Sequence, residues 1–421
     1  MGRRRVVVTA MGAVTPVGNT ADETWRALCS GKSGVSAIEY LPLGDFPVRI
    51  AGQVKNFSLK DSRLPAKRKN VLSRSACFGV AALLDAIDSS KFDFGTVAAE
   101  EKGLAIGTSV QWPPLQQFSD MMTLIEVSGG RQLPRYSPVD VMQRSYNTGM
   151  SVMAQLTDAQ GPSIGISTAC ASSAHAIGEA FRCIQNGEAK VMFAGGFDAM
   201  TSYLDILGFT LLGALTTQHS DEPEKASRPF SKDRSGFVLG EGGVVVVLEE
   251  LAHALGRGAS PLAEVLGYGS SMNGYRMTDA PPGGGQSITA MQQALDEAAI
   301  SPQSIGYVCA HGTGTAGNDV SETEAIKAVF GNHAYELALS SPKSMTGHLT
   351  SASGALNFLV AVNVLRTQCA PPTINLDEPS PLLDLNYVPH QTAVVSTNAA
   401  MANAFAFGGT NVSLVVSSIS D

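Results

Sequence analysis

Short apolar runs rich in β-branched residues alternate along the chain with longer, alanine-rich amphipathic stretches. The short runs predict buried strands, and the longer stretches have the periodicity of helices. We expect strands over residues 5–10, 102–108, 163–168, 191–195, 242–248, 263–268, 305–310, 338–341, 393–397 and 413–418. We expect helices over residues 21–30, 69–89, 140–156, 171–187, 287–299, 319–330 and 351–365. This alternation predicts an α/β protein with mostly parallel sheets that are covered by helices.

The same order of elements starts again in the second half of the chain. The opening strand and loop at residues 8–13 (VTAMGA) have a counterpart at residues 265–270 (VLGYGS). The segment around Cys170 resembles the segment that leads to His348, because each passes from a strand through small residues into a helix. We therefore predict two related halves, at residues 1–255 and 256–421.

Composition narrows the class of protein. Charged residues make up 16% and apolar residues 44% of the 421 residues, which is typical of a globular chain with a large interior. The formal charge of −8 disfavours nucleic acid as a partner. Six cysteines without a CxxC pair argue against a disulfide scaffold or a zinc site and favour a reducing, cytoplasmic compartment. The apolar runs are shorter than the roughly 18 residues of a membrane span, so we expect no membrane segment.

Cys170 is the first candidate for chemistry. It lies where an extended run of small residues meets an alanine-rich stretch, so we expect the thiol at the N-terminus of a helix. Unpaired backbone N–H groups and the helix dipole favour a thiolate there, with a pKa below the usual value of about 8.5. A cysteine taken alone is more often a small buried core residue. Residues elsewhere in the chain favour the catalytic interpretation.

Two histidines lie at similar junctions in the second half. His311 follows an apolar strand and opens a loop with three glycines, and His348 lies between a strand and a helix. Sites in α/β proteins form at the carboxyl ends of parallel strands, so we expect both rings near Cys170. Residues 403–411 (NAFAFGGTN) include Gly408, and we expect the N–H groups of the glycines there to face an oxyanion.

Six motifs in register point to one family. They are STACASS (167–173), RPFSKDRSGFVLGEG (228–242), AHGTGT (310–315), KSMTGH (343–348), PPTINLD (371–377) and AFGGTN (406–411). Over essentially its whole length, the chain resembles the β-ketoacyl-acyl-carrier-protein synthases, the elongating condensing enzymes of fatty-acid and type II polyketide pathways. The resemblance implies a thiolase-like fold, a duplicated αβαβα layered sandwich in a two-fold dimer. It also implies decarboxylative Claisen condensation of a cysteine-bound acyl chain with a malonyl group on a carrier protein.

The resemblance assigns roles to the reacting groups. Cys170 would accept the acyl chain as a thioester. Neutral His311 and His348 would donate hydrogen bonds to the enolate that forms as carbon dioxide leaves. The backbone N–H groups of Cys170 and Phe407 would bind the tetrahedral oxyanion. Phe407 would also gate the nucleophile, with Gly408 permitting movement of its loop.

Other matches concern support and substrate binding. We interpret Lys343 and Glu322 as a buried ion pair that positions the histidine loops, with a direct catalytic role of Lys343 as the alternative. Thr313 and Thr315 would hydrogen-bond a phosphopantetheine arm. The resemblance implies no cofactor, because that arm of a carrier protein holds the substrates.

The positions that resemble the acyl pocket of the family are unusual in this chain. They are Val110, Gln111, Trp112, Gln143, Asn147, Phe209 and Phe405. The polar members and Trp112 favour a specialised substrate, such as a polyene or polyketide intermediate, over a long saturated chain.

The expected partners are an acyl carrier protein and a second chain. The second chain is either a copy of this one or a related ketosynthase-like subunit that sets chain length. Basic residues in positions that resemble the docking surface for an acidic carrier are Lys67, Arg68, Lys69, Arg131 and Arg135.

Three other functions stay open at this point. A coenzyme A-dependent biosynthetic thiolase would share the fold, but it normally uses a second cysteine near the C-terminus, and Cys369 lies in no histidine- or glycine-rich context. A chain-length subunit would lack the nucleophile, whereas this chain has Cys170 and both histidines. A cysteine hydrolase would need an acidic residue to orient a histidine, and neither histidine motif contains one.

Overall fold

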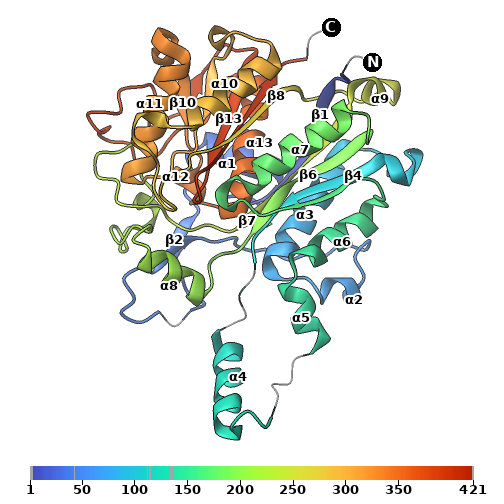
Figure 1. The fold of residues 1–421 in the computed structure, drawn as a ribbon, viewed down its shortest axis with the longest axis vertical. Coiled ribbons are helices and arrows are strands. Elements are labelled where there is room, and N and C mark those ends of the chain that lie inside the picture. Colours follow the sequence, from blue (N-terminus) through green and yellow to red (C-terminus); the bar gives the residue numbers. More distant parts are fainter. Residues whose placement is uncertain (1–2, 42, 111, 113–114, 133–136, 420–421) are drawn as a thin grey trace.

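The computed structural model describes residues 3–41, 43–110, 112, 115–132 and 137–419 (Figure 1). Ten strands of this part of the chain form one sheet in the order β10-β9-β13-β14-β8-β1-β7-β6-β4-β5. In chain order these strands are β1 (Val6–Val14), β4 (Lys102–Gly107), β5 (Ser163–Ile166), β6 (Val191–Asp198), β7 (Gly242–Glu250), β8 (Ala263–Met272), β9 (Tyr307–Cys309), β10 (Ala338–Ser340), β13 (Ala399–Phe405) and β14 (Thr410–Ser417). Two small sheets pair β2 (Val35–Ala37) with β3 (Ile50–Gly52) and β11 (Cys369–Ala370) with β12 (Ala393–Val394).

Helices connect and cover these strands. The longer ones are α1 (Ala21–Cys29), α3 (Arg74–Ser90), α4 (Leu115–Ser128), α6 (Tyr146–Thr157), α7 (Ser172–Gln185), α8 (Tyr203–Leu211), α10 (Ser287–Ala298), α11 (Ala316–Phe330) and α13 (Ser353–Thr367). The shorter ones are α2 (Ala66–Lys69), α5 (Pro138–Arg144), α9 (Leu251–Gly256) and α12 (Lys343–Thr346). Within the described residues, none of the helices combines the length and the apolar character that crossing a bilayer requires.

The two halves of the sheet repeat one order of elements. The first half reads β1, α3, β4, α6, β5, α7, β6, β7, and the second half reads β8, α10, β9, α11, β10, α13, β13, β14. The halves meet where residues 6–8 of β1 pair antiparallel with residues 263–265 of β8. The predicted duplication is confirmed by this symmetry, whereas the boundary after residue 255 stays a prediction.

The prediction of mostly parallel strands is wrong, because the sheet is mixed. Its outer pairs are parallel, namely β10 with β9, β9 with β13, β6 with β4 and β4 with β5. The central pairs from β13 to β6 are antiparallel. β14 follows β13 through a short turn, and β7 follows β6 through a longer connection that contains α8. In each half the last strand returns antiparallel to its predecessor.

Five layers result from this sheet and its helices. α7 and α13 pack against each other and against both halves of the sheet, and they form the central layer (Figure 1). Residues 353–365 of α13 are all buried, as expected for a helix that is apolar on every side. On the outer faces, α3 packs on β1, β7 and β6, and α10 packs on β8 and β14. This is the predicted αβαβα sandwich.

Several predicted elements differ in position. Of the strand expected at residues 393–397, only Ala393–Val394 is extended, as β12 of a small sheet. The strand of the central sheet is β13, which follows it and whose small residues (AAMANAF) lack the β-branched signal of a buried strand. The helix expected at 140–156 divides at Ser145, where the backbone is extended with ψ 121°. The sequence pattern did not predict α8 or α4. In Figure 1, α4 stands away from the body, and none of its residues is buried.

Candidate active site

The nucleophile lies on a strained turn between β5 and α7. Ala169, the residue before Cys170, has a left-handed backbone with φ 48°, which a non-glycine residue adopts only at a cost. The Ser172 hydroxyl donates to the carbonyl of Ala169 (2.7 Å) and accepts the N–H of Thr168 (2.8 Å). Gly107 of β4 passes so close to this turn that a Cβ there would lie 2.4 Å from the Ser172 carbonyl carbon. These contacts place Cys170 just ahead of α7, as predicted.

The protonation state of Cys170 differs from the expected thiolate. Burial raises the pKa of its thiol to about 11, and the nearby Lys343 charge lowers that pKa only in part. The backbone N–H groups of Phe407 and of Cys170 itself also lower the pKa by donating toward the sulfur. Burial outweighs the favourable end of the helix, so the resting sulfur is a thiol near neutral pH. The two N–H groups are those that we predicted for an oxyanion hole.

A single cleft brings most of the predicted catalytic residues together. Its empty volume, including the part open to solvent, is about 930 Å³. The predicted residues that line it are Cys170, His311, Thr313, Thr315, Glu322, His348, Phe405 and Phe407. Elements from both halves of the chain therefore meet at one site.

The two histidine rings are neighbours within the cleft. Their centroids are 5.4 Å apart, and the ring planes are inclined by 80°. Nδ1 of His348 accepts the N–H of Thr350 (3.1 Å) and lies 2.7 Å from the hydroxyl of Ser353. This nitrogen therefore carries no proton, which places the ring proton of the neutral imidazole on Nε2. Burial, with the Lys343 charge second, holds the pKa values of both histidines well below 6.5.

Two carboxylates of α11 hold the His311 loop by its backbone. Glu322 accepts the N–H groups of His311 (2.7 Å) and Gly312 (2.8 Å). Asp319, one helical turn earlier, accepts those of Thr313 (3.0 Å) and Gly314 (3.2 Å). Asp319 is a supporting residue that the sequence interpretation missed, although an acidic pair three residues apart after a glycine-rich loop is a usable signal.

The predicted ion pair between Lys343 and Glu322 is not formed. Within the described residues, no carboxylate lies within ion-pair distance of the Lys343 amine, which is buried and has no hydrogen-bond partner. The Glu322 carboxylate is occupied by the loop N–H groups instead. Burial lowers the pKa of Lys343, and its charge acts on the thiol and on both imidazoles at longer range.

The Phe407 loop closes one side of the cleft. Gly408 and Gly409 have φ values of 86° and 84°, so both are in the left-handed region that favours glycine. The Gly408 N–H donates to the carbonyl of Met277 (2.7 Å), so the prediction that it faces an oxyanion is wrong. The ring centroids of Phe407 and Phe237 are 6.3 Å apart, and those of Phe237 and His348 are 5.2 Å apart.

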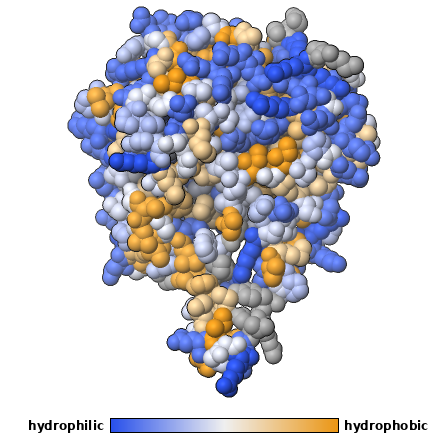
Figure 2. Space-filling view, viewed as in Figure 1, coloured by the Kyte–Doolittle hydropathy of each residue, from blue (hydrophilic) through white to orange (hydrophobic). Residues whose placement is uncertain are grey.

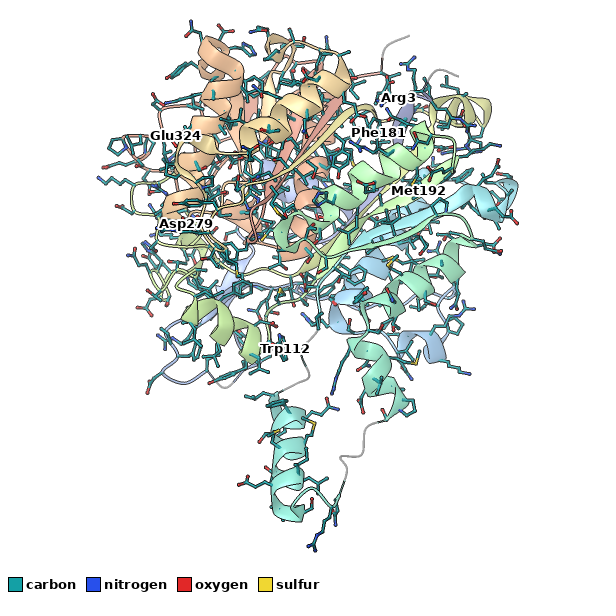
Figure 3. All side chains as sticks on the ribbon, viewed as in Figure 1. Arg3, Trp112, Phe181, Met192, Asp279 and Glu324 are labelled. Carbon is teal, nitrogen blue, oxygen red and sulfur yellow. The ribbon has the colours of Figure 1, made fainter. Side chains whose placement is uncertain are left out.

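Most of the predicted acyl-pocket residues lie outside this cleft. Phe405 lines the cleft. Phe209 packs on the cleft-lining Phe237, with the two ring centroids 5.7 Å apart. Val110 and Trp112 are 63% and 57% exposed, and Figure 3 places Trp112 where the chain leaves the body toward α4.

The polar members of the set that the structure describes, Gln143 and Asn147, do not line the cleft either. The Gln143 amide donates to the carbonyl of Asn70 (2.9 Å), and Asn147 is exposed. Gln111 lies outside the described residues. In this single chain Val110, Trp112, Gln143 and Asn147 do not line the cleft, and their assignment to the acyl pocket stays a prediction. Val110 and Trp112 lie between β4 and α4, Gln143 lies on α5, and Asn147 lies on α6.

The predicted docking residues lie on the surface and apart from the cleft lining. Lys67, Arg68 and Lys69 form most of α2, with exposed or half-buried side chains. Arg131 is exposed beyond the end of α4, and Arg135 lies outside the described residues.

His175 is a second residue that the sequence interpretation missed. Its Nδ1 lies 2.8 Å from the Thr168 hydroxyl, and its Nε2 lies 2.9 Å from the hydroxyl of Ser270 on β8. Burial lowers the pKa of this imidazole. The ring therefore links the turn that carries Cys170 to the other half of the sheet.

Comparisons with known proteins agree with this geometry. The family descriptions "Beta-ketoacyl synthase, N-terminal domain" and "Beta-ketoacyl synthase, C-terminal domain" match residues 3–254 and 262–377. Two curated relatives named 3-oxoacyl-[acyl-carrier-protein] synthase 2 are similar over nearly the whole chain. The protein of Synechocystis is 40% identical over 98% of this chain and 97% of its own length, and that of Vibrio cholerae is 41% identical over 99% of each.

Solved structures with the same fold include ketosynthases of two kinds. A β-ketoacyl synthase from Burkholderia phymatum superposes with a TM-score of 0.89 at 32% identity, covering 99% of this chain and all of that one. The AntDE:AntF structure, a type II polyketide acyl-carrier protein in complex with its ketosynthase bound to the hexaketide, gives 0.87 at 32% identity and the same coverage. The ishigamide ketosynthase/chain length factor gives 0.88 at 29% identity over both whole chains.

Proposed function

The chain belongs to the β-ketoacyl synthase family, and from this premise we propose that it is a 3-oxoacyl-acyl-carrier-protein synthase with Cys170 as its nucleophile. It is an acyltransferase that condenses an acyl chain with a malonyl group in fatty-acid or type II polyketide biosynthesis. The observation that carries the residue assignment is the shared cleft. It holds one thiol and two neutral imidazoles, and two backbone N–H groups point at the sulfur.

In the first half-reaction, the chain moves from the carrier to the enzyme. The Cys170 thiol loses its proton as the sulfur attacks the thioester carbonyl of the acyl-carrier protein. The N–H groups of Cys170 and Phe407 bind the tetrahedral oxyanion. The oxyanion then collapses, and the phosphopantetheine sulfur leaves as a thiol with that proton. The product is an acyl-enzyme, which predicts ping-pong kinetics.

In the second half-reaction, a malonyl group on the carrier loses carbon dioxide. The carbon–carbon bond to the carboxylate breaks, and its electron pair forms an enolate on the malonyl thioester. Nε2–H of His348 donates to the enolate oxygen, with His311 beside it as the second neutral donor. The enolate carbon attacks the acyl thioester, the sulfur of Cys170 leaves, and a β-ketoacyl-carrier protein is formed.

The remaining predicted residues have supporting roles. Thr313 and Thr315 line the cleft with their hydroxyls 2.9 Å apart, which supports contact with the amides of the phosphopantetheine arm. Glu322 fixes the position of the His311 loop through its backbone N–H groups. The charge of Lys343 lowers the pKa values of the Cys170 thiol and of both imidazoles. These steps use side chains and backbone N–H groups alone, so we propose that the reaction needs no cofactor.

The partners follow from the chemistry. The acyl carrier protein is the substrate donor, and the chain functions as a dimer with a copy of itself or with a related chain-length subunit. Lys67, Arg68, Lys69, Arg131 and Arg135 form our proposed electrostatic docking set. We also propose a cytoplasmic location.

A heterodimer with a related chain-length subunit is the second candidate for the assembly. Exposed apolar side chains favour an assembly with a partner chain over an isolated chain. α4 and α5 carry exposed apolar side chains, including Met122, Val127 and Val141, with exposed fractions of 49%, 82% and 60%. A partner chain would cover them. A thiolase reaction is disfavoured because Cys369, on β11, is not among the residues that line the cleft.

A condensation assay tests the function. The protein is incubated with a hexanoyl group and a malonyl group, each on a bacterial type II acyl carrier protein, and the carrier products are identified by mass. We expect β-ketoacyl-carrier protein together with one carbon dioxide per product. Carbon–carbon bond formation by a Cys170→Ala variant, or none by the wild type with either partner arrangement, would contradict the proposal.

A further inference from the structure

Asn357 is a polar residue inside an otherwise largely apolar helix. It lies on α13, where residues 353–365 are all buried, and it is itself only 1% exposed. Polar residues on the surface that Figure 2 shows can hydrogen-bond to water, whereas a buried amide must find its partners inside the protein. The partners of the Asn357 amide therefore indicate its role.

Both of these partners are backbone carbonyls, and they belong to two neighbouring strands. Nδ2 of Asn357 donates to the carbonyl of Ala310 (3.1 Å) and to that of Asn403 (2.8 Å). The parallel pairing of β9 with β13 ends at Cys309 and Ala402, so the two carbonyls belong to the next residue on each side. The amide thus joins the two chain segments directly beyond the end of their pairing.

These partners also fix the orientation of the amide. An oxygen in the place of Nδ2 would face two carbonyl oxygens, so the NH₂ group must be the end that points at them. The Oδ1 of Asn357 is buried and has no hydrogen-bond partner among the described residues. The side chain therefore acts through its two donated hydrogen bonds.

The two joined segments carry two groups of the reaction. His311 directly follows Ala310 in the sequence. Phe407, whose backbone N–H donates toward the Cys170 sulfur, lies four residues after Asn403. The distance between the two segments at the level of the amide therefore affects how far the imidazole lies from that N–H group.

A second connection closes a ring of hydrogen bonds. Nδ2 of Asn403 donates to Oε1 of Glu322 (3.4 Å), and the same oxygen accepts the N–H of His311 (2.7 Å). The ring runs through Glu322, Asn403 and Asn357, and the chain at residues 310–311 completes it. Side chains that share a buried network hold their partners more firmly than one hydrogen bond does.

We propose that Asn357 is a positioning residue, which holds the His311 imidazole and the Phe407 N–H at the separation that the condensation requires. The inference rests on the proposed function, in which the imidazole meets the malonyl enolate and the N–H binds the oxyanion of the acyl thioester. The enolate and the thioester must approach each other to form one carbon–carbon bond. A change in this separation therefore slows the reaction without removing a reacting group.

Two substitutions remove the donated hydrogen bonds. Asn357→Leu fills the space of the amide, and Asn357→Ala leaves that space open. The matched controls are Asn363→Leu and Asn363→Ala, because Asn363 is buried on the same helix (4% exposed) and its side-chain oxygen accepts from Arg366 (2.9 Å). Each protein is assayed for condensation with a hexanoyl and a malonyl group on a bacterial type II acyl carrier protein.

For both Asn357 variants, we expect kcat to fall about 10- to 100-fold, with KM for the carrier-borne substrates unchanged. The ¹⁵N NMR signals of the His311 ring, identified by their loss in a His311→Ala variant, should shift. The Asn363 variants should match the wild type in both measurements. In Asn357→Leu/Glu322→Gln, the kcat loss should be smaller than the product of the two single losses, because both substitutions open the same ring.

Four results would overturn the inference. An unchanged kcat, or an equal loss in the Asn363 variants, would mean that the two hydrogen bonds have no part in the reaction. A loss in only one of the two Asn357 variants would assign the effect to packing. If neither Asn357 variant folds while both Asn363 variants do, as judged by circular dichroism, Asn357 is a residue of the folding core instead.

Failure of the proposed function would give a different pattern. A wild-type protein that forms no β-ketoacyl product would refute that function. The shift of the His311 signals needs no turnover, so it would still decide whether Asn357 holds this imidazole in place.

Discussion

The backbone N–H of Thr350 donates to Nδ1 of His348 across 3.1 Å. This bond decides what the imidazole can do, because the nitrogen that faces Thr350 must be the unprotonated one. The ring proton then lies on Nε2, and His348 enters the reaction as a hydrogen-bond donor. In the same site Cys170 rests as a thiol, so its proton must leave during acyl transfer and cannot go to an Nε2 that already carries one.

The first prediction concerns the tautomer of His348. Burial and the Lys343 charge hold the pKa of this imidazole well below 6.5, so it should stay neutral from pH 8 down to pH 6. In ¹⁵N NMR spectra of histidine-labelled protein, one protonated Nε2 and one unprotonated Nδ1 should disappear in a His348→Ala variant. An imidazolium signal at pH 7 that is lost in this variant would contradict the assignment.

The second prediction concerns the reactivity of Cys170. Because the pKa of its thiol is about 11, the thiolate fraction and the rate of iodoacetamide alkylation should rise about tenfold per pH unit from pH 7 to 10. Lys343→Met removes a charge that lowers this pKa, so alkylation should be slower throughout that range. Lys55→Met, at an exposed position, is the control. A plateau below pH 9 would show that the sulfur is ionised more easily than burial allows.

The third prediction concerns the support of the His311 loop. In Glu322→Gln, the amide offers one acceptor where two N–H groups were bound, and its –NH₂ faces the other. The free energy of unfolding should fall by about 1–3 kcal/mol, and kcat should fall because His311 is displaced. Glu324→Gln is the matched control, because Glu324 lies on the same helix and accepts the N–H of Gly283 at an exposed site (2.7 Å). Equal effects of the two substitutions would refute a special role of Glu322.

The fourth prediction concerns His175. In His175→Ala, the hydroxyls of Thr168 and Ser270 lose their shared partner, and the strained turn before Cys170 is less firmly held. We expect kcat to fall about tenfold with KM unchanged, and alkylation of Cys170 to slow. His390→Ala, at an exposed position, should have neither effect. A lower melting temperature with unchanged kcat would reduce His175 to a stabilising residue.

The fifth prediction concerns charge at α2. Replacing Lys67, Arg68 and Lys69 by Glu should raise KM for carrier-borne substrate, because an acidic carrier would be repelled. The rise should shrink at high salt, where exposed charges are screened. If KM is the same as in the wild type at low salt, α2 has no part in docking.

The meeting of Cys170, His311 and His348 was predictable from the sequence. Cys170 and His311 follow β5 and β9 closely, and His348 lies between β10 and α13, beyond the short helix α12. The topology brings such junctions to one end of a layered α/β fold. The duplicated order of elements was predictable for a similar reason, since hydrophobic periodicity repeats in both halves. Local sequence patterns were therefore sufficient to predict the position of a residue when that position depends only on the strand or helix next to it.

Properties that depend on tertiary burial were not predictable. The helix start at α7 favours a thiolate locally, but the degree of burial of Cys170 reverses that preference. The sequence predicts an ion pair between Lys343 and Glu322. In the fold, the Glu322 carboxylate instead accepts the N–H groups of His311 and Gly312. Val110 and Trp112 lie on a segment that leaves the body, and no pattern of apolar residues reveals that direction.

The most direct test measures the intact mass of the protein after incubation with a panel of acyl-carrier thioesters. The wild type should gain the mass of one acyl group per chain, and the Cys170→Ala protein should gain none. Transfer of the same acyl mass to the Cys170→Ala protein would contradict the central claim that this sulfur carries the growing chain.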